Sequence, residues 1–155
     1  MRSRDGGRGA QRRDRFSKGR RTNVYPGDLQ YSESHQWARV EDGVVTVGVT
    51  HYAQEQLGDI VYVELPSPDE EAKRGEPLGS VESVKAVADV NSPVSGRVME
   101  VNTDLDDEPE KINQDCYGAG WLAKIELSEP AEVRSLMNAQ QYVQHLQQLG
   151  EQRGR

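Results

Sequence analysis

The sequence has almost no cysteine, since Cys116 is the single cysteine in 155 residues. One cysteine excludes an intrachain disulfide framework and a metal cluster built on cysteines, and it fits a reducing compartment. Long apolar runs are missing too: none approaches the roughly 18 residues that cross a bilayer, and the N-terminus lacks the apolar core of a secretory signal. We therefore expect an intracellular protein with no membrane contact.

Recognisable catalytic motifs are also absent. His35, His51 and His145 have no HxH or HExxH spacing, and the chain contains no GxSxG, GxGxxG or Walker sequence. Cys116 lies in DCYGAGW, where small and aromatic neighbours favour a partly buried structural cysteine over a reactive one. The sequence thus predicts neither an enzyme nor a metal-binding protein.

Charge is distributed very unevenly. Residues 1–21 hold nine Arg or Lys against two Asp, about +7, whereas the rest of the chain holds 10 against 24, or −14. This first segment has one aromatic residue, Phe16, and cannot bury enough apolar surface to fold. We predict a disordered tail over residues 1–28, a domain over 29–150 and a disordered end over 151–155.

An arginine-rich tail can also contact nucleic acid or serve as a mitochondrial presequence. A single aromatic residue offers little stacking to bases, and Asp5, Asp14 and the early glycines interrupt an amphipathic presequence helix. We therefore expect a solvated tail and no nucleic-acid partner. The compartment expected is the cytoplasm, with the mitochondrial matrix as the alternative.

Short strands dominate the middle of the chain. Residues 37–42 and 44–49 alternate apolar and polar side chains around Asp42-Gly43, a strong hairpin signal. A helix over 51–57, with Thr50 as its N-cap, is expected to follow the hairpin. Further strands are expected at 60–65, 77–84, 86–93, 97–102 and 121–127.

Turns and helices connect and follow these strands. The charged residues 70–76 are interpreted as an exposed turn, and residues 103–120 as a polar stretch. The last 25 or so residues have helical spacing, with Asn138 between two helices. The pattern as a whole predicts a mainly β sandwich or barrel with short helices at its ends.

Lys85 stands at the centre of GSVESVKAVADVNSPVSG, residues 79–96. If the two valine-rich strands form a hairpin, a tight turn at Val84-Lys85-Ala86 pushes the amine into water. Such an amine can be acylated by a modifying enzyme, and the amide then carries a swinging arm. From spacing alone, an ordinary exposed turn lysine is the alternative.

The sequence ESVKA in this setting closely resembles the lipoylation segment of the glycine cleavage system H protein family. Residues 31–66 resemble the start of that family and residues 116–142 its end, in the same order and with the same spacing. The resemblance covers about 120 of 155 residues. It implies a hybrid of barrel and sandwich sheets of the lipoyl type, with the lipoyl lysine at a hairpin tip and helices at the C-terminus.

The resemblance implies transport rather than catalysis. Lipoate in amide linkage to Lys85 would accept an aminomethyl group from a pyridoxal-phosphate glycine decarboxylase. An aminomethyltransferase would then pass the one-carbon unit to tetrahydrofolate, and a dihydrolipoyl dehydrogenase would reoxidise the arm. Glu82, three residues before the lysine, would be recognised by the lipoate-attaching enzyme. We expect this carrier to be a monomer.

The resemblance also implies a cleft that shelters the loaded arm, with Ser34 and Asp89 at matching positions. Where the family usually has His-Glu-Trp, this chain has Gln36, so a carboxylate near that cleft is missing. Gln36 can accept a hydrogen bond from an ammonium but adds no charge. Gly79 and Gly96 flank the hairpin, where bends or close backbone approach are expected.

Other carriers fit less well. A biotin carrier typically has methionines beside its lysine, where this chain has Val84 and Ala86. The lipoyl domain of a 2-oxoacid dehydrogenase is normally joined to further domains, for which 155 residues are too few. Two alternatives stay open: an H-like lipoyl carrier or lipoate donor that serves 2-oxoacid dehydrogenases or another pathway, and an unmodified β interaction module.

Overall fold

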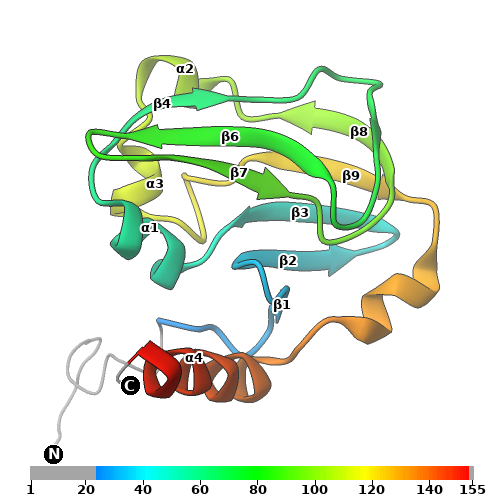
Figure 1. Cartoon of the computed structure of the whole chain (residues 1–155). Coiled ribbons are helices and arrows are strands. Elements are labelled where there is room, and N and C mark those ends of the chain that lie inside the picture. The colour runs from blue at the N-terminus through cyan, green and yellow to red at the C-terminus, as the bar shows by residue number, and fades with distance from the viewer. Residues whose placement is uncertain (1–23, 154–155) are drawn as a thin grey trace, which may run out of the picture.

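The structure, a computed structural model, describes residues 24–153. Two antiparallel sheets form the body of the protein (Figure 1). The larger sheet has the strand order β1-β2-β3-β9-β8-β5 and the smaller one β4-β6-β7. The strands of the larger sheet are Gln30–Tyr31 (β1), Gln36–Glu41 (β2), Val44–Val49 (β3), Glu71–Ala72 (β5), Gly96–Val101 (β8) and Ala123–Leu127 (β9). Those of the smaller sheet are Ile60–Glu64 (β4), Pro77–Ser83 (β6) and Val87–Asn91 (β7). The mainly β fold expected from the sequence is confirmed.

The hairpin β2–β3 turns where the sequence predicts it. Asp42 has φ of 50° and Gly43 has φ of 80°, so both central residues adopt the left-handed conformation that two-residue hairpin loops require. The strands pair from Gln36 opposite Val49 to Glu41 opposite Val44.

Helix α1 (His51–Leu57) follows this hairpin directly. The Thr50 hydroxyl accepts a hydrogen bond from the Ala53 amide at 3.3 Å and so caps the first turn. Gly58 ends the helix with φ of 81°, a backbone conformation that a side chain would disfavour. The predicted helix and its Thr50 N-cap are confirmed.

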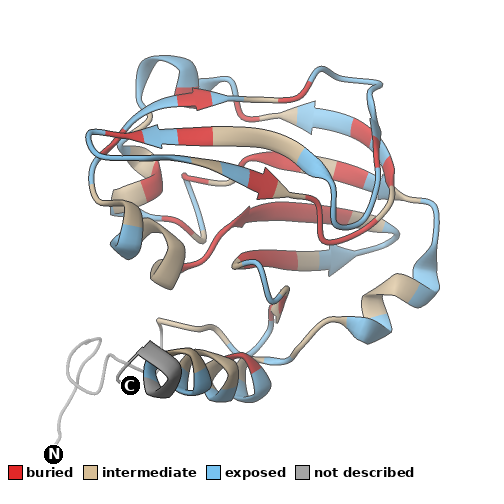
Figure 2. Ribbon diagram, viewed as in Figure 1, coloured by how far each residue is buried: buried red, intermediate tan, exposed pale blue. Residues whose placement is uncertain are grey.

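The main core joins the two sheets. Val49 of β3 packs in one cluster with residues of β4, β6 and β7, namely Val63, Val81 and Val90. Two short helices, α2 (Asp104–Asp107) and α3 (Lys111–Gln114), complete this cluster with Leu105 and Ile112, both fully buried. In Figure 2 the buried residues lie mainly in the strands.

Two expectations about the connections are wrong. Residues 103–120 contain α2 and α3 rather than a merely polar stretch, because one apolar residue in each four-residue helix is enough to fix it to the core. Residues 70–76 contain strand β5, in which Ala72 is buried and pairs with Gly96. The five charged residues around Ala72 hid this two-residue strand.

The C-terminal segment forms a 3-10 helix, η2 (Pro130–Ser135), and then α4 (Ala139–Arg153). Asn138 separates them, as predicted, and its Oδ1 accepts a hydrogen bond from the Gln141 amide at 2.8 Å. Helix α4 therefore extends into the segment expected to be a disordered end. None of the described helices is long and apolar enough to cross a membrane.

Residues 24–28, which the sequence places in the tail, lie against the domain. Tyr25 meets the ring of Tyr142 edge to face, with centroids 5.4 Å apart, and the Tyr31 hydroxyl donates to the Pro26 carbonyl at 2.6 Å. The aromatic side chain of Tyr25 gives this stretch apolar surface to bury. The rest of the predicted tail, residues 1–23, and residues 154–155 lie outside the described residues.

Candidate functional site

Lys85 lies in the turn that joins β6 to β7, which we call the lysine turn (residues 84–86). The Ser83 side chain organises it: its hydroxyl oxygen accepts hydrogen bonds from the amides of Lys85 at 3.2 Å and Ala86 at 3.1 Å. The Ser83 amide also donates to the Ala86 carbonyl at 2.7 Å. A serine that bonds to backbone amides two and three residues onward is a known turn former, so this role of Ser83 was readable from the sequence but was not predicted.

The Lys85 side chain is exposed and lies beside the end of α1. A Cβ built on Gly58 would be 3.8 Å from Cε of Lys85. Within the described part of the chain, no acidic side chain forms an ion pair with Lys85. The amine therefore stands in water at the tip of a hairpin, which is the arrangement that the sequence predicts.

Asn113 of α3 holds the loop on which the lysine turn rests. The Val84 amide donates to the Asp59 carbonyl at 3.3 Å. On either side of Asp59, the Asn113 side chain donates to the Gly58 carbonyl at 2.8 Å and accepts from the Ile60 amide at 2.9 Å. One amide side chain thus fixes the backbone before and after the residue that supports the turn. Asn113 carries no sequence signal for this role, because its partners are more than 50 residues away.

Replacing Asn113 with alanine is expected to lower the free energy of unfolding by about 1–3 kcal/mol, because it leaves the Ile60 amide and the Gly58 carbonyl without these partners. Amide hydrogen exchange should rise at Ile60 and Val84 more than in β2 and β3. Gln114→Ala, an exposed neighbour on the same helix, is the control. Equal protection of the Val84 amide from hydrogen exchange in the two variants would contradict this role of Asn113.

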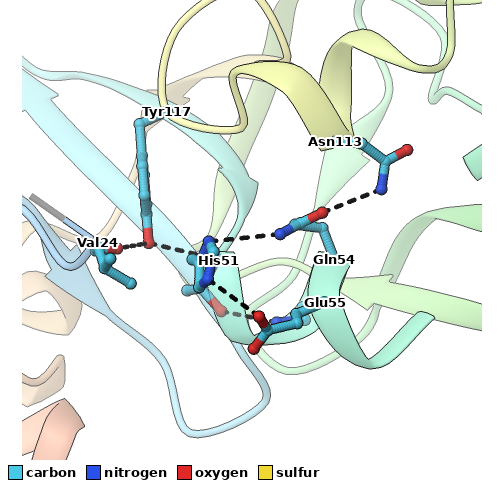
Figure 3. Close-up of polar contacts among 8 residues, drawn as sticks. Val24, His51, Gln54, Glu55, Asn113 and Tyr117 are labelled. Atoms are coloured by element: carbon cyan, nitrogen blue, oxygen red, sulfur yellow. Dashed lines mark hydrogen bonds and ion pairs between the residues drawn. The ribbon is translucent and has the colours of Figure 1, made fainter. Parts of the chain in front are cut away.

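The Asn113 side chain belongs to a longer chain of polar contacts along α1 (Figure 3). Asn113 donates to Gln54 Oε1 at 3.0 Å, and Gln54 Nε2 lies 3.4 Å from Nδ1 of His51. The His51 amide donates to the Tyr117 hydroxyl at 3.0 Å, and that hydroxyl in turn donates to the carbonyl of Val24. The segment before β1 is therefore connected through α1 to the loop beneath the lysine turn.

A cleft of about 270 Å³ opens between α1, the start of β2 and the hairpin β6–β7. We call it the α1 cleft. The three residues that the family resemblance assigns to an arm-sheltering cleft all line it: Ser34, Gln36 and Asp89. His35, Tyr52 and Gln56 line it as well and were not predicted. The cleft also reaches Leu57, which precedes Gly58 at the end of α1, and Ala88, two residues after the lysine turn.

Gln36 is buried, and both the oxygen and the nitrogen of its side-chain amide form hydrogen bonds within its own loop. Its Oε1 accepts hydrogen bonds from the hydroxyls of Ser32 and Ser34, each at 2.6 Å, and its Nε2 donates to the Ser34 carbonyl at 2.9 Å. The expectation that Gln36 accepts a hydrogen bond from an ammonium does not fit this arrangement, because both acceptor directions of Oε1 are in use. Gln36 instead fixes the position of Ser34.

One hydroxyl joins the two walls of the α1 cleft. The Tyr142 hydroxyl of α4 lies 2.7 Å from His35 Nδ1 and 2.8 Å from Thr50 Oγ1. His35 belongs to the loop of Gln36 and has φ of 77°, while Thr50 caps α1. Burial raises the pKa of Tyr142, and the hydrogen bond with Thr50 opposes this to a lesser extent. The phenol therefore stays protonated and can donate one of these two bonds.

Glu82 lies on the exposed face of the smaller sheet. It pairs with Tyr62 of β4 on one side and Val87 of β7 on the other. Its carboxylate is thus on the same hairpin as Lys85 and accessible to a partner, although it is not part of the α1 cleft.

Gly79 and Gly96 lie where two backbones approach closely. A Cβ on Gly79 would overlap the Glu64 carbonyl of β4, and a Cβ on Gly96 would overlap the Glu126 carbonyl of β9. Strand β6 also has an irregular register between Pro77 and Gly79. Both glycines fit structural rather than chemical roles.

Cys116 is buried, and burial, with a smaller contribution from Asp115, raises the pKa of its thiol to about 12. A thiol with this pKa is almost entirely protonated at neutral pH and is a poor nucleophile. Within residues 24–150, no group of three or more His, Cys, Asp or Glu side chains is placed to hold a metal ion.

We expect Cys116 in the folded protein to react with a maleimide at pH 8 at least about tenfold more slowly than in 6 M guanidinium, because the thiolate is both rare and covered. Stopped-flow labelling measures both rates. Similar rates with and without denaturant would show that the thiol is accessible and would contradict its structural assignment.

Comparisons with known proteins agree with this geometry. The family profile of the glycine cleavage H-protein matches residues 29–149. The glycine cleavage system H protein of Symbiobacterium thermophilum is 55% identical over 117 residues, covering 76% of this chain and 91% of that protein. Glycine cleavage system H protein 4 of Aquifex aeolicus is 52% identical over 126 residues, covering 81% and 74%. The crystal structure of a glycine cleavage system H protein from Mycobacterium marinum matches with a TM-score of 0.71 and 42% identity, covering 76% of this chain and 94% of that one. The chain therefore belongs to the glycine cleavage H-protein family.

Proposed function

We propose that this chain is the lipoyl-carrying shuttle of a glycine cleavage system, with lipoate attached in amide linkage to Lys85. The observation that supports this most directly is the exposed Lys85 at a hairpin tip, which forms no ion pair with the described residues 24–150, in a chain about half identical to glycine cleavage system H proteins. In this role the chain is a substrate of other enzymes rather than a catalyst.

The fit of lipoate to these residues is good. A long acyl arm needs an amine that projects into water, and Ser83 and Asn113 hold the turn so that Lys85 projects. When bound, lipoate supplies a dithiolane that takes up the aminomethyl group of glycine. The residues of this chain present the arm, and they receive its end again after each visit to a partner.

The α1 cleft suits a cationic cargo. Asp89 contributes the negative charge among the three predicted residues, and Ser34 contributes a hydroxyl. Gln36 holds the Ser34 side chain in place through a 2.6 Å hydrogen bond. An ammonium in this cleft would be attracted to the Asp89 carboxylate and partly removed from water, which protects a cargo that water would release.

The proposed partners follow from this cycle. They are a pyridoxal-phosphate glycine decarboxylase, a tetrahydrofolate-dependent aminomethyltransferase, a dihydrolipoyl dehydrogenase and a lipoate-attaching enzyme. We propose that the carrier meets them as a monomer in the cytoplasm. The body of the chain is acidic, which suits brief docking on basic enzyme surfaces.

The test is to purify the full chain from lipoate-replete cells and to measure its intact mass, with fragment mapping of the modified residue. Glycine-dependent exchange of carbon dioxide with the purified decarboxylase is measured on the same sample. A lipoyl increment at Lys85 together with exchange would establish the shuttle. An increment without exchange would favour a lipoate donor for another pathway, and no increment would leave an unmodified β module.

A further inference from the structure

The N-terminal segment is fixed to the domain at one defined place. The Tyr117 hydroxyl donates a hydrogen bond to the Val24 carbonyl and accepts one from the His51 amide at 3.0 Å (Figure 3). His51 is the first residue of α1, and the next residue, Tyr52, lines the α1 cleft. Residues 1–23 therefore join the described part of the chain beside the α1 cleft.

The α1 cleft is bordered by exposed carboxylates. Three segments that line or border it, residues 33–36, 51–59 and 84–90, contain four acidic residues and a single lysine, Lys85. The acidic residues, all exposed, are Glu33, Glu55, Asp59 and Asp89. Within residues 24–150, none of these four forms an ion pair with a lysine or an arginine. Lipoylation would convert the Lys85 ammonium into a neutral amide and leave the four carboxylates without a nearby lysine charge.

The N-terminal segment carries the opposite charge close to its point of attachment. Residues 1–21 hold nine arginines or lysines against two aspartates, and the last two of these residues are Arg20 and Arg21. Three extended residues, the separation of Arg21 from Val24, span about 10 Å, and α1 rises about 8 Å over five residues. Arg21 can therefore reach the whole length of the α1 cleft. A group tethered this closely is present at an effective concentration on the order of millimolar, which favours even a weak contact.

We propose, on the basis of the function above, that Arg20 and Arg21 bind over the α1 cleft, with the Asp89 carboxylate as their main partner. Asp89 is the one carboxylate of the four that lines the cleft itself. A guanidinium matches a carboxylate in charge and can donate two parallel hydrogen bonds to it. A guanidinium at Asp89 takes the position that the ammonium of an aminomethyl cargo would take. The end of a segment that composition predicts to be solvated thus has a binding site on its own domain.

This contact depends on the state of the arm. A lipoyl arm without cargo is uncharged, so it does not compete with a guanidinium for Asp89. An arm loaded with the aminomethyl group ends in an ammonium and does compete. Because lipoylation also removes the charge of Lys85, the two arginines are held most strongly when the arm is attached but empty. They cover the α1 cleft between rounds of transport and leave it when the arm returns with cargo.

The experiment attaches a nitroxide spin label to Ser17→Cys in the full chain produced without lipoate. Amide NMR intensities are compared with the label oxidised and reduced, which gives the paramagnetic effect at each residue. The effect should be strong at Gln56 and Asp89, and replacing Arg20 and Arg21 together with glutamine should reduce it there at least about threefold. Sodium chloride at about 0.5 M should reduce it similarly, because the Debye length falls to about 4 Å.

Two controls separate this contact from simple proximity to the label. Arg12→Gln with Arg13→Gln removes the same charge farther along the segment and should change the paramagnetic effect by less than about 1.5-fold. Asp89→Asn should reduce the effect at least about twofold, whereas Glu71→Gln, at an exposed carboxylate of β5, should leave it unchanged. Cys116 is buried and stays unlabelled in a brief reaction. The same spectra show whether each variant keeps its fold.

Equal results for the two arginine pairs, or no response to Asp89→Asn, would overturn the proposal. So would a paramagnetic effect in the lipoylated chain that stays the same when the arm is loaded with the aminomethyl group, because cargo and arginines would then not share a site. The first measurements need no lipoate, so a negative result there leaves the proposed function standing. A chain that acquires no lipoate would refute the proposed function, whereas the contact of the arginines with Asp89 would still be decided by the spectra.

Discussion

Replacing Lys85 with arginine is expected to abolish both the lipoyl mass increment and glycine-dependent exchange, while leaving the fold intact. Arginine keeps the positive charge and most of the length, but its guanidinium stays protonated and is not acylated under conditions where a lysine amine is. Since Lys85 is exposed and forms no ion pair with the described residues, the free energy of unfolding should change by less than about 0.5 kcal/mol. Intact mass, exchange rate and urea unfolding are measured on one preparation.

Lys73→Arg is the matched control, because Lys73 is also exposed and lies directly after a strand. This variant should gain lipoate and support exchange as the unaltered chain does. A lipoyl increment that persists in Lys85→Arg would place the modification on another lysine and would contradict the assignment of Lys85 as the attachment site.

Replacing Trp37 with alanine should produce the largest loss of stability, about 3–5 kcal/mol. Its side chain is fully buried with Leu29, Tyr31 and Tyr142, and its indole N–H donates to the Cys116 carbonyl at 2.9 Å. The truncation leaves a large cavity and an unpaired carbonyl. The residue paired with Trp37 on strand β3 is Gly48, which has no side chain that could move into the space. Urea unfolding followed by far-ultraviolet circular dichroism measures the loss.

Trp121→Ala makes the same chemical change at a half-buried site, where the ring lies 5.3 Å from the Lys124 ammonium. Its cost should be clearly smaller, about 1–2 kcal/mol, because less apolar area leaves water at this position on folding. If the two alanine variants are equally stable, the assignment of Trp37 to a tightly packed cluster is wrong.

Features with local causes were predictable from the sequence. The Asp42-Gly43 hairpin, the Thr50 cap and the lysine turn each depend on residues within a few positions of one another, so a pattern reveals them. The hidden strand at Ala72 was missed because two residues are too few to form a pattern. This strand exists because it pairs with β8, and that pairing cannot be inferred from the residues next to Ala72 in the sequence.

The α1 cleft was predictable only in part. Ser34, Gln36 and Asp89 came from the family resemblance, and the structure brings them together. The residues that shape the site, Asn113 and Tyr142, contact it across separations of more than 50 residues along the chain. Such contacts are set by tertiary packing. Neither the secondary-structure propensity of a segment nor the spacing of its residues along the sequence predicts them. Gln36 shows the same limit, because only the structure reveals that its oxygen is occupied by two serine hydroxyls.

The division of the strands between two sheets has a consequence for the order of synthesis. All of the sheet that bears Lys85 comes from one continuous stretch, residues 60–91, whereas the larger sheet needs strands from both halves of the chain. Short sequence separations favour early pairing, so the hairpin with the lysine can form while the ribosome is still translating. Helix α4 is translated after every other described element, and its Tyr142 hydroxyl is what joins the walls of the α1 cleft. On a nascent chain, the amine is therefore presented before the shelter for its cargo is complete.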